Sequence, residues 1–128
     1  MGEIKCIIAG GRDFTNYEAL KKALATVKFG NNKVAIISGT ARGADSLGER
    51  YAKEKNYELM RFPANWNKYG RSAGMIRNKQ MLEQANCVIC FWDGKSPGTR
   101  NMIQITKAAG KPVAVFNYDG NLSEYNRN

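Results

Sequence analysis

The chain has 128 residues, 43% of them hydrophobic, which is typical of one globular domain and excludes a disordered chain. No apolar run approaches the roughly 20 residues that cross a bilayer, and charges closely follow the first apolar stretch, so we expect a cytoplasmic protein without a secretory signal or membrane partner. Lys and Arg number 20 against 11 Asp and Glu, and the resulting +9 charge favours phosphorylated ligands or nucleic acid.

Apolar runs and amphipathic segments alternate from the start of the chain. Residues 4–10 form a short apolar run ending in glycine, which predicts a buried strand. Thr15 and Glu18 have capping-box spacing, so the first helix is expected to begin at Thr15 and to end near Gly30. Residues 33–38 predict a second strand.

The same alternation continues through the middle of the chain. Residues 44–52 carry an apolar stripe at helical spacing, and 57–62 predict a partly exposed strand. Residues 63–73 are expected to be an irregular loop. A helix is expected over 75–85.

The last part predicts a strand over 87–92, a helix over 99–109 and a strand over 112–116. Residues 1–116 are expected to form a single domain, and the polar tail, 117–128, is expected to fray. Strand–helix–strand repeats predict an α/β fold: a Rossmann-like, doubly wound parallel sheet of about five strands with helices on both faces. If the strand order is 3-2-1-4-5, a crevice opens at the carboxyl ends of strands 1 and 4.

Cys6, Cys87 and Cys90 all lie in apolar runs. Residues three apart in a strand point to opposite faces, so Cys87 and Cys90 cannot share a metal or form a disulfide. The chain has no histidine. We therefore expect buried core cysteines and no metal site.

Three of the four strand-to-helix loops combine glycine with polar or charged residues: 10–13, 38–45 and 93–99. Parallel strands place these loops at the same sheet edge, where glycine lets a ligand approach and helix N-termini attract phosphate or carboxylate. The alternative is that the glycines only form turns and that Asp45 and Thr99 only cap helices. No loop matches a P-loop or a G-x-G-x-x-G fingerprint, so ATPase and dinucleotide oxidoreductase chemistry are disfavoured and no cofactor is expected.

The loop before the third helix carries Trp66 and Tyr69, which are suited to stacking on a base or to forming a lid. Arg77 is suited to a phosphate, and Asn78 to a ribose or base edge. The alternative, equally open, is that Trp66 packs on the sheet edge and Arg77 is solvated.

Four ordered motifs, GGRDF, SGTARGAD, WNKYGRSAGMIRN and FWDGKSPGTRNMI, resemble the YspA-like (cpYpsA-related) branch of the SLOG superfamily over about residues 4–116. That superfamily also includes the Lonely Guy phosphoribohydrolases and the core of the DNA-processing protein DprA. The resemblance implies a nucleotide-derived ligand and a homo-oligomer. Together with Trp66, the ligand shell that it implies consists of Gly11, Arg12, Asp13, Ser38, Gly39, Arg42, Gly43, Asp45, Arg77, Asn78, Ser96, Gly98 and Thr99.

The chain departs from the Lonely Guy pattern in one respect. Those enzymes carry a glutamate after their Gly-Thr, whereas Gly98-Thr99 is followed here by Arg100 and Asn101. Cleavage of an N-glycosidic bond needs a carboxylate, which weakens the case for an enzyme. Asp13, Asp45 and Asp93 remain candidates for that carboxylate.

Three functions follow from these observations. The first, which the resemblance implies, is a sensor or sequestering protein for an ADP-ribose derivative or a cyclic nucleotide that acts on immune signalling; a phage origin would fit it. The second is a nucleotide N-glycosidase or phosphoribohydrolase. The third is single-strand nucleic-acid binding, which the +9 charge permits.

Overall fold

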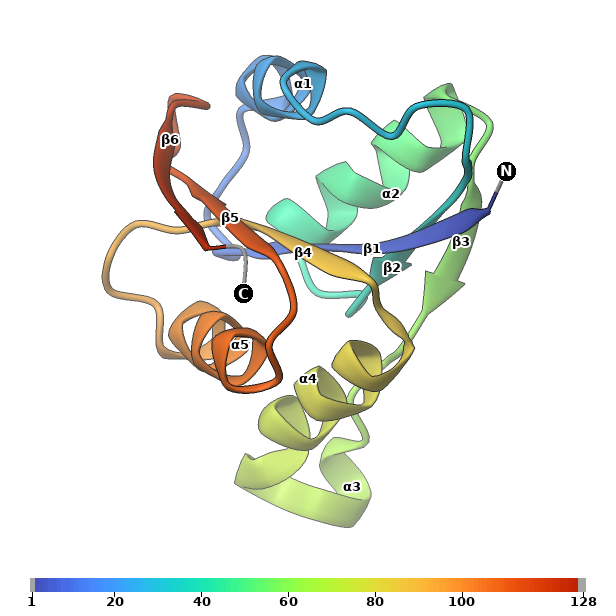
Figure 1. The fold of residues 1–128 in the computed structure, drawn as a ribbon. Helices are drawn as coiled ribbons and strands as arrows, with labels where there is room; N and C mark the ends of the chain where they lie inside the picture. Colours follow the sequence, from blue (N-terminus) through green and yellow to red (C-terminus); the bar gives the residue numbers. More distant parts are fainter. Residues whose placement is uncertain (1, 127–128) are drawn as a thin grey trace.

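Six strands form one mixed sheet in a computed structural model that describes residues 2–126 (Figure 1). Met1 and the last two residues of the predicted tail lie outside the described residues. The order across the sheet is β3-β2-β1-β4-β5-β6. The strands are β1 (Glu3–Gly10), β2 (Lys33–Ser38), β3 (Glu58–Arg61), β4 (Cys87–Phe91), β5 (Val113–Phe116) and β6 (Leu122–Asn126).

The first five strands pair in parallel, in the order 3-2-1-4-5. The predicted Rossmann-like α/β fold is therefore confirmed. The chain moves outward from β1 to β3 and then crosses to β4 on the other side of β1. The carboxyl ends of β1 and β4 consequently form the switch point at which open α/β sheets bind ligands.

Helices cover both faces of the sheet (Figure 1). On one face lie α1 (Tyr17–Ala25) and α2 (Ala44–Glu54), and on the other lie α4 (Ala73–Gln84) and α5 (Pro97–Ala108). A short helix, α3 (Trp66–Tyr69), and a 3₁₀ turn, η1 (Gly70–Ser72), lead into α4. None of the helices within residues 2–126 has the length and apolarity needed to cross a membrane.

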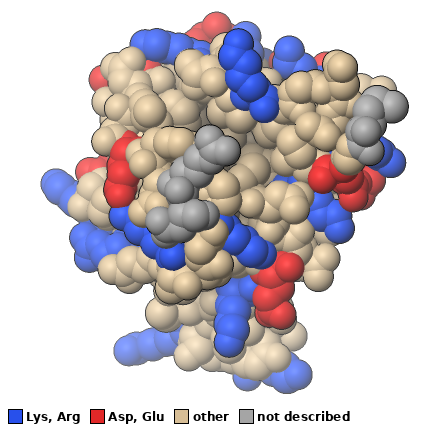
Figure 2. All heavy atoms as spheres, in the orientation of Figure 1, with Lys and Arg blue, Asp and Glu red and all other residues tan. Residues whose placement is uncertain are grey.

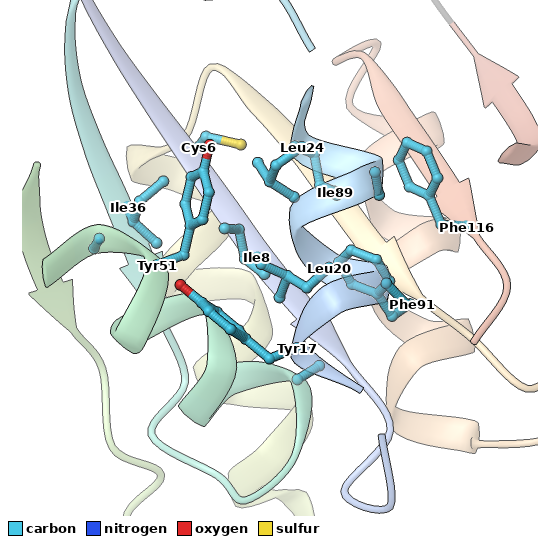
Figure 3. Packing of buried hydrophobic residues seen from close by; sticks show 14 of the residues in the cluster. Cys6, Ile8, Tyr17, Leu20, Leu24, Ile36, Tyr51, Ile89, Phe91 and Phe116 are labelled. Carbon is cyan, nitrogen blue, oxygen red and sulfur yellow. The ribbon is translucent and has the colours of Figure 1, made fainter. Parts of the chain in front are cut away.

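Two hydrophobic cores lie on the two faces of the sheet because successive strand side chains point in opposite directions. Cys6 and Ile8 of β1 pack beneath α1 and α2 (Figure 3), whereas Ile7 packs against α4 and α5. Cys87 packs against the first core and Cys90 lies in the second, so these two thiols face opposite sides as predicted. All three cysteines are free.

The first helix begins one residue later than the capping-box spacing predicts. Asn16, not Thr15, is the N-cap, and its side-chain oxygen accepts a hydrogen bond from the Ala19 N–H at 3.0 Å. Asparagine is at least as good an N-cap as threonine, which explains the preference. The helix also ends well before Gly30, at Ala25, where the Thr26 hydroxyl donates to a carbonyl of the last turn.

The segment predicted as an irregular loop contains helical turns instead. The Asn65 side chain caps α3 by accepting a hydrogen bond from Lys68 N–H at 3.1 Å. Helix α4 starts at Ala73, two residues earlier than predicted. Helix α5 starts at Pro97, since proline at the first helical position loses no hydrogen bond.

Residues 122–126 form a strand rather than part of a frayed tail. A turn in which Asn117 and Gly120 are hydrogen-bonded reverses the chain, and β6 pairs antiparallel with β5. Leu122 and Tyr125 are 58% and 57% exposed, so this strand joins the sheet through its backbone and adds little to the core.

Lys and Arg side chains are spread over the face shown in Figure 2, with Asp and Glu between them. No single basic arm stands out on that face.

Candidate functional site

A cavity of about 700 Å³, the main chamber, opens at the carboxyl ends of β1 and β4. It lies between the loops that follow these strands and the first turns of α4 and α5. Most of the predicted site residues line it: Gly11, Arg12, Asp13, Asp45, Trp66, Arg77, Asn78, Ser96, Gly98 and Thr99. The structure therefore brings together residues from four separate segments of the sequence.

A second cavity of about 280 Å³, the small chamber, adjoins the first. The predicted residues Gly39 and Arg42 line it, together with Thr40, Pro63 and Ala64. Both chambers share Arg12, Ala41, Trp66 and Arg77.

Two predicted residues, Ser38 and Gly43, line neither chamber. The buried Ser38 hydroxyl donates to Glu49 at 2.7 Å and accepts from Thr40 N–H at 3.0 Å, so it braces the loop after β2. Gly43 has φ 75°, and a Cβ there would lie 2.2 Å from the Gly11 carbonyl oxygen. Both residues thus shape the site without facing it.

Gly11 joins the loops at the switch point. Its N–H donates to the Phe91 carbonyl at 3.1 Å, and its carbonyl accepts from the N–H groups of Phe14 and Ala44. These bonds connect the ends of β1 and β4 with the start of α2. Backbone hydrogen bonds therefore hold the glycine loops together.

Several loop N–H groups are already bonded within the protein and are therefore not free for a ligand. Asp45 accepts from Ala41 N–H at 3.1 Å, and Asp93 accepts from the N–H groups of Lys95 and Ser96, both at 2.8 Å. These two backbone bonds lower the pKa of Asp93.

The start of α5 presents N–H groups at the main chamber. Among the described residues, the N–H groups of Gly98 and Thr99 have no hydrogen-bond partner. Pro97 has no N–H, and a Cβ at Gly98 would meet no atom within 4 Å. An anion in the main chamber could therefore approach these two N–H groups and the positive end of the helix dipole.

Arg77 and Asp45 meet beside Gly39. The Arg77 guanidinium donates to the Gly39 carbonyl, and its buried Nε has no partner among the described residues. A Cβ at Gly39 would lie 2.7 Å from Arg77 Nη1 and 2.8 Å from Asp45 Oδ2, so glycine leaves room for these two side chains. The prediction that leaves Arg77 in bulk solvent is therefore wrong.

Burial raises the pKa of the Asp45 carboxyl to about 6. The Ala41 N–H and the Arg77 charge lower this pKa, while Glu49 raises it, so burial outweighs the favourable neighbours. The pKa of Arg77 is itself lowered by burial. A carboxyl group that titrates near pH 6 inside a cavity is typical of functional sites.

The Asn78 amide nitrogen bonds to protein acceptors. It donates to the Gly98 carbonyl at 3.2 Å and to Asn101 Oδ1 at 3.0 Å, so Asn78 ties α4 to the start of α5. The amide nitrogen is thus engaged within the protein, and the contact of Asn78 with a base or ribose stays a prediction.

Sequence reasoning missed Tyr118, which contacts the loop after β1. Its hydroxyl donates to Asp13 Oδ1 at 2.6 Å, and its ring lies 5.0 Å from that of Phe14. Burial and the bond to Asp13 raise the pKa of Tyr118. A Cβ at Gly11 would lie only 1.8 Å from the Tyr118 hydroxyl. Nothing in the polar segment after 116 pointed to this contact.

The main chamber also has an apolar wall, which sequence reasoning did not predict. Met75, Met81, Met102 and Pro97 contribute to it beside Trp66. Trp66 is 51% exposed and faces both chambers, so it does not pack into the sheet edge. Tyr69 lines neither chamber. No cluster of metal-binding side chains occurs within residues 2–126.

The chain is similar to three kinds of known protein. A family model described as "YspA, cpYpsA-related SLOG family" matches residues 4–69. The Gene 61 protein of Mycobacterium phage D29 is 32% identical over 124 residues, which cover 88% of this chain and 95% of the phage protein.

The third similarity is structural. DNA processing protein A (DprA) from Streptococcus pneumoniae superposes with a TM-score of 0.69 at 14% identity, covering 89% of this chain. This chain spans half the length of that DprA chain, and at this identity the likeness concerns the fold alone. The family match, the phage relative and the shared fold agree with the loop motifs and the switch-point cavity: the chain belongs to the YspA, cpYpsA-related SLOG family.

Proposed function

We propose that the protein binds a nucleotide-derived, phosphorylated small molecule in the main chamber. The observation that carries this proposal is a cavity that combines arginines and an apolar wall with the N–H groups of Gly98 and Thr99, which have no partner within residues 2–126. Its volume of about 700 Å³ lies within the roughly 300–1,000 Å³ typical of small-molecule sites.

The two ends of such a ligand would make different contacts. A phosphate fits the start of α5, where the helix dipole favours negative charge. A base fits against Trp66 and Met75, which are 51% and 58% exposed and line the same cavity. Aromatic stacking accepts any base, so this wall favours nucleotides as a class rather than one base.

The test is calorimetric titration of AMP, ADP-ribose and cyclic ADP-ribose into the wild-type protein and Gly98→Val. Valine would fill the space in front of the helix N-terminus without meeting protein atoms near its Cβ. We expect at least one ligand to bind the wild type and Gly98→Val to weaken it at least about tenfold, as loss of a charge-assisted contact does. Ala109→Val, at the far end of α5, is the control. An absence of binding by all three ligands would refute the proposal.

Such a protein acts by sensing or by sequestering its ligand. The phage relative favours sequestration of a nucleotide used in host immune signalling. Native mass spectrometry of the protein purified from cells measures both a co-purified nucleotide and the expected homo-oligomer.

Hydrolysis of an N-glycosidic bond is the second candidate, and Asp45 is the observation that favours it. Its carboxyl, with a pKa of about 6, lines the main chamber and can exchange a proton near neutral pH. Release of free base from nucleoside monophosphates by the wild type and not by Asp45→Asn would support an enzyme. Equal release by both proteins would exclude Asp45 as the catalytic group.

Single-strand nucleic-acid binding makes a different prediction. Oligonucleotide affinity would then fall steeply with salt, as counterion release requires. Binding of a mononucleotide that saturates at one site and blocks the oligonucleotide would favour the small-molecule function instead.

A further inference from the structure

We propose that the small chamber is a second anion subsite for the same ligand, so that the ligand carries two separated phosphates. A nucleoside 3′,5′-bisphosphate or a dinucleotide has this chemistry. The inference rests on the proposed function and specifies the ligand class.

The small chamber differs from the main chamber in charge. Among residues 2–126, arginine is the only charged residue type that lines it, at positions 12, 42 and 77. The main chamber has three arginines, but three aspartates, Asp13, Asp45 and Asp93, line it as well. The small chamber therefore presents positive charge, and no carboxylate of the described part of the chain lines it, which favours an anionic group.

Arginine side chains supply the charged donors for that anion. The N–H groups of Thr40 and Ala41 in the chamber wall are bonded to Ser38 and Asp45 and are not free for it. The planar fork of a guanidinium group matches the oxygens of a phosphate. Thr40 also has φ 66°, unusual for a β-branched residue, so its loop is held in a shape that an unconstrained chain would avoid.

The two chambers are joined through Arg77. It lines both, as Arg12 and Trp66 do, and its buried Nε has no hydrogen-bond partner among the described residues. The small chamber, at about 280 Å³, falls just below the roughly 300 Å³ lower limit for small-molecule pockets. A phosphate or a sugar phosphate therefore suits it, with the remainder of the ligand in the main chamber.

The experiment compares AMP with adenosine 3′,5′-bisphosphate, and GMP with guanosine 3′,5′-bisphosphate, by calorimetry. Arg42→Gln alters the small chamber alone, and Arg71→Gln alters the main chamber alone. Lys28→Gln, an exposed change of the same charge away from both chambers, is the control.

We expect the wild type to bind a bisphosphate at least about tenfold more tightly than its monophosphate, and Arg42→Gln to weaken the bisphosphate far more than the monophosphate, so that this preference is lost. Arg71→Gln should weaken both ligands, and Lys28→Gln neither. Equal affinities for the two ligands, or an Arg42→Gln loss shared by both, would overturn the two-phosphate inference and leave nucleotide binding standing. Binding of no nucleotide would overturn the proposed function together with this inference.

Discussion

The substitution Asp45→Asn tests whether the buried carboxyl beside Arg77 titrates as its surroundings require. Burial raises its pKa from 3.8 to about 6. Because the pKa is raised, the stabilising state is the neutral carboxyl: its contribution is fully present below pH 3.8 and is lost as the pH rises through about 6. At 1.36 kcal/mol per pKa unit, the difference between these two pKa values corresponds to about 3 kcal/mol in the free energy of unfolding. About 1 kcal/mol of this loss falls between pH 5 and pH 7.

No histidine titrates in that pH range, because the sequence contains none. Lowered carboxyl pKa values, such as those of Glu54 and Asp93, affect stability only at lower pH. Urea unfolding at pH 5 and pH 7 should therefore show the wild type less stable at pH 7 by about 1 kcal/mol, or roughly 4 °C in Tm. Asp45→Asn should lose this dependence.

Asp119→Asn provides the matched control, since it removes an exposed carboxylate on the loop after β5. Its pH dependence should equal that of the wild type. If Asp45→Asn also retained the wild-type dependence between pH 5 and pH 7, the carboxyl would not be held in the neutral form, and the argument from burial would fail.

Three further predictions concern the fold. In Gly48→Ala, the new Cβ would lie 2.9 Å from Ile8 Cβ. The overpacking should cost about 1–3 kcal/mol, which should exceed the gain of about 1 kcal/mol in helix propensity. Urea unfolding measures the net loss of stability. Asn16→Ala should cost about 1 kcal/mol and Thr15→Ala less than about 0.5 kcal/mol; the reverse order in thermal unfolding would contradict the observed N-cap. Only Cys87 should react with a thiol reagent in the native protein, because the other two cysteines are fully buried; three fast-reacting thiols before unfolding would disagree with the packing.

The parallel sheet and its switch point could be predicted because the strands are nearly continuous apolar runs and the loops between them are rich in glycine. The same loops predicted much of the cavity wall, including Arg12, Gly98 and Thr99. Each of these residues lies next to a strand end or a helix start, whose position the hydrophobic pattern defines. The position of a loop was thus predictable from local sequence.

The partners of individual groups were not predictable in the same way. Tyr118 reaches Asp13 across 105 positions of sequence, and Arg77 reaches the Gly39 carbonyl across 38. Such contacts depend on how the finished elements pack, which a hydrophobic pattern does not encode. The sequence predicted Ser38 as a ligand-binding residue, yet its hydroxyl donates a hydrogen bond to Glu49 of helix α2.

The added strand β6 has a consequence for association between molecules. Without it, β5 would expose its row of backbone N–H and C=O groups, and its apolar sequence, VAVF, would be open to pairing with another chain. The residues of β6 are mostly polar, and Glu124 forms an ion pair with Lys107 of α5. A protein shortened after Phe116 should therefore aggregate at concentrations where the full chain stays dispersed.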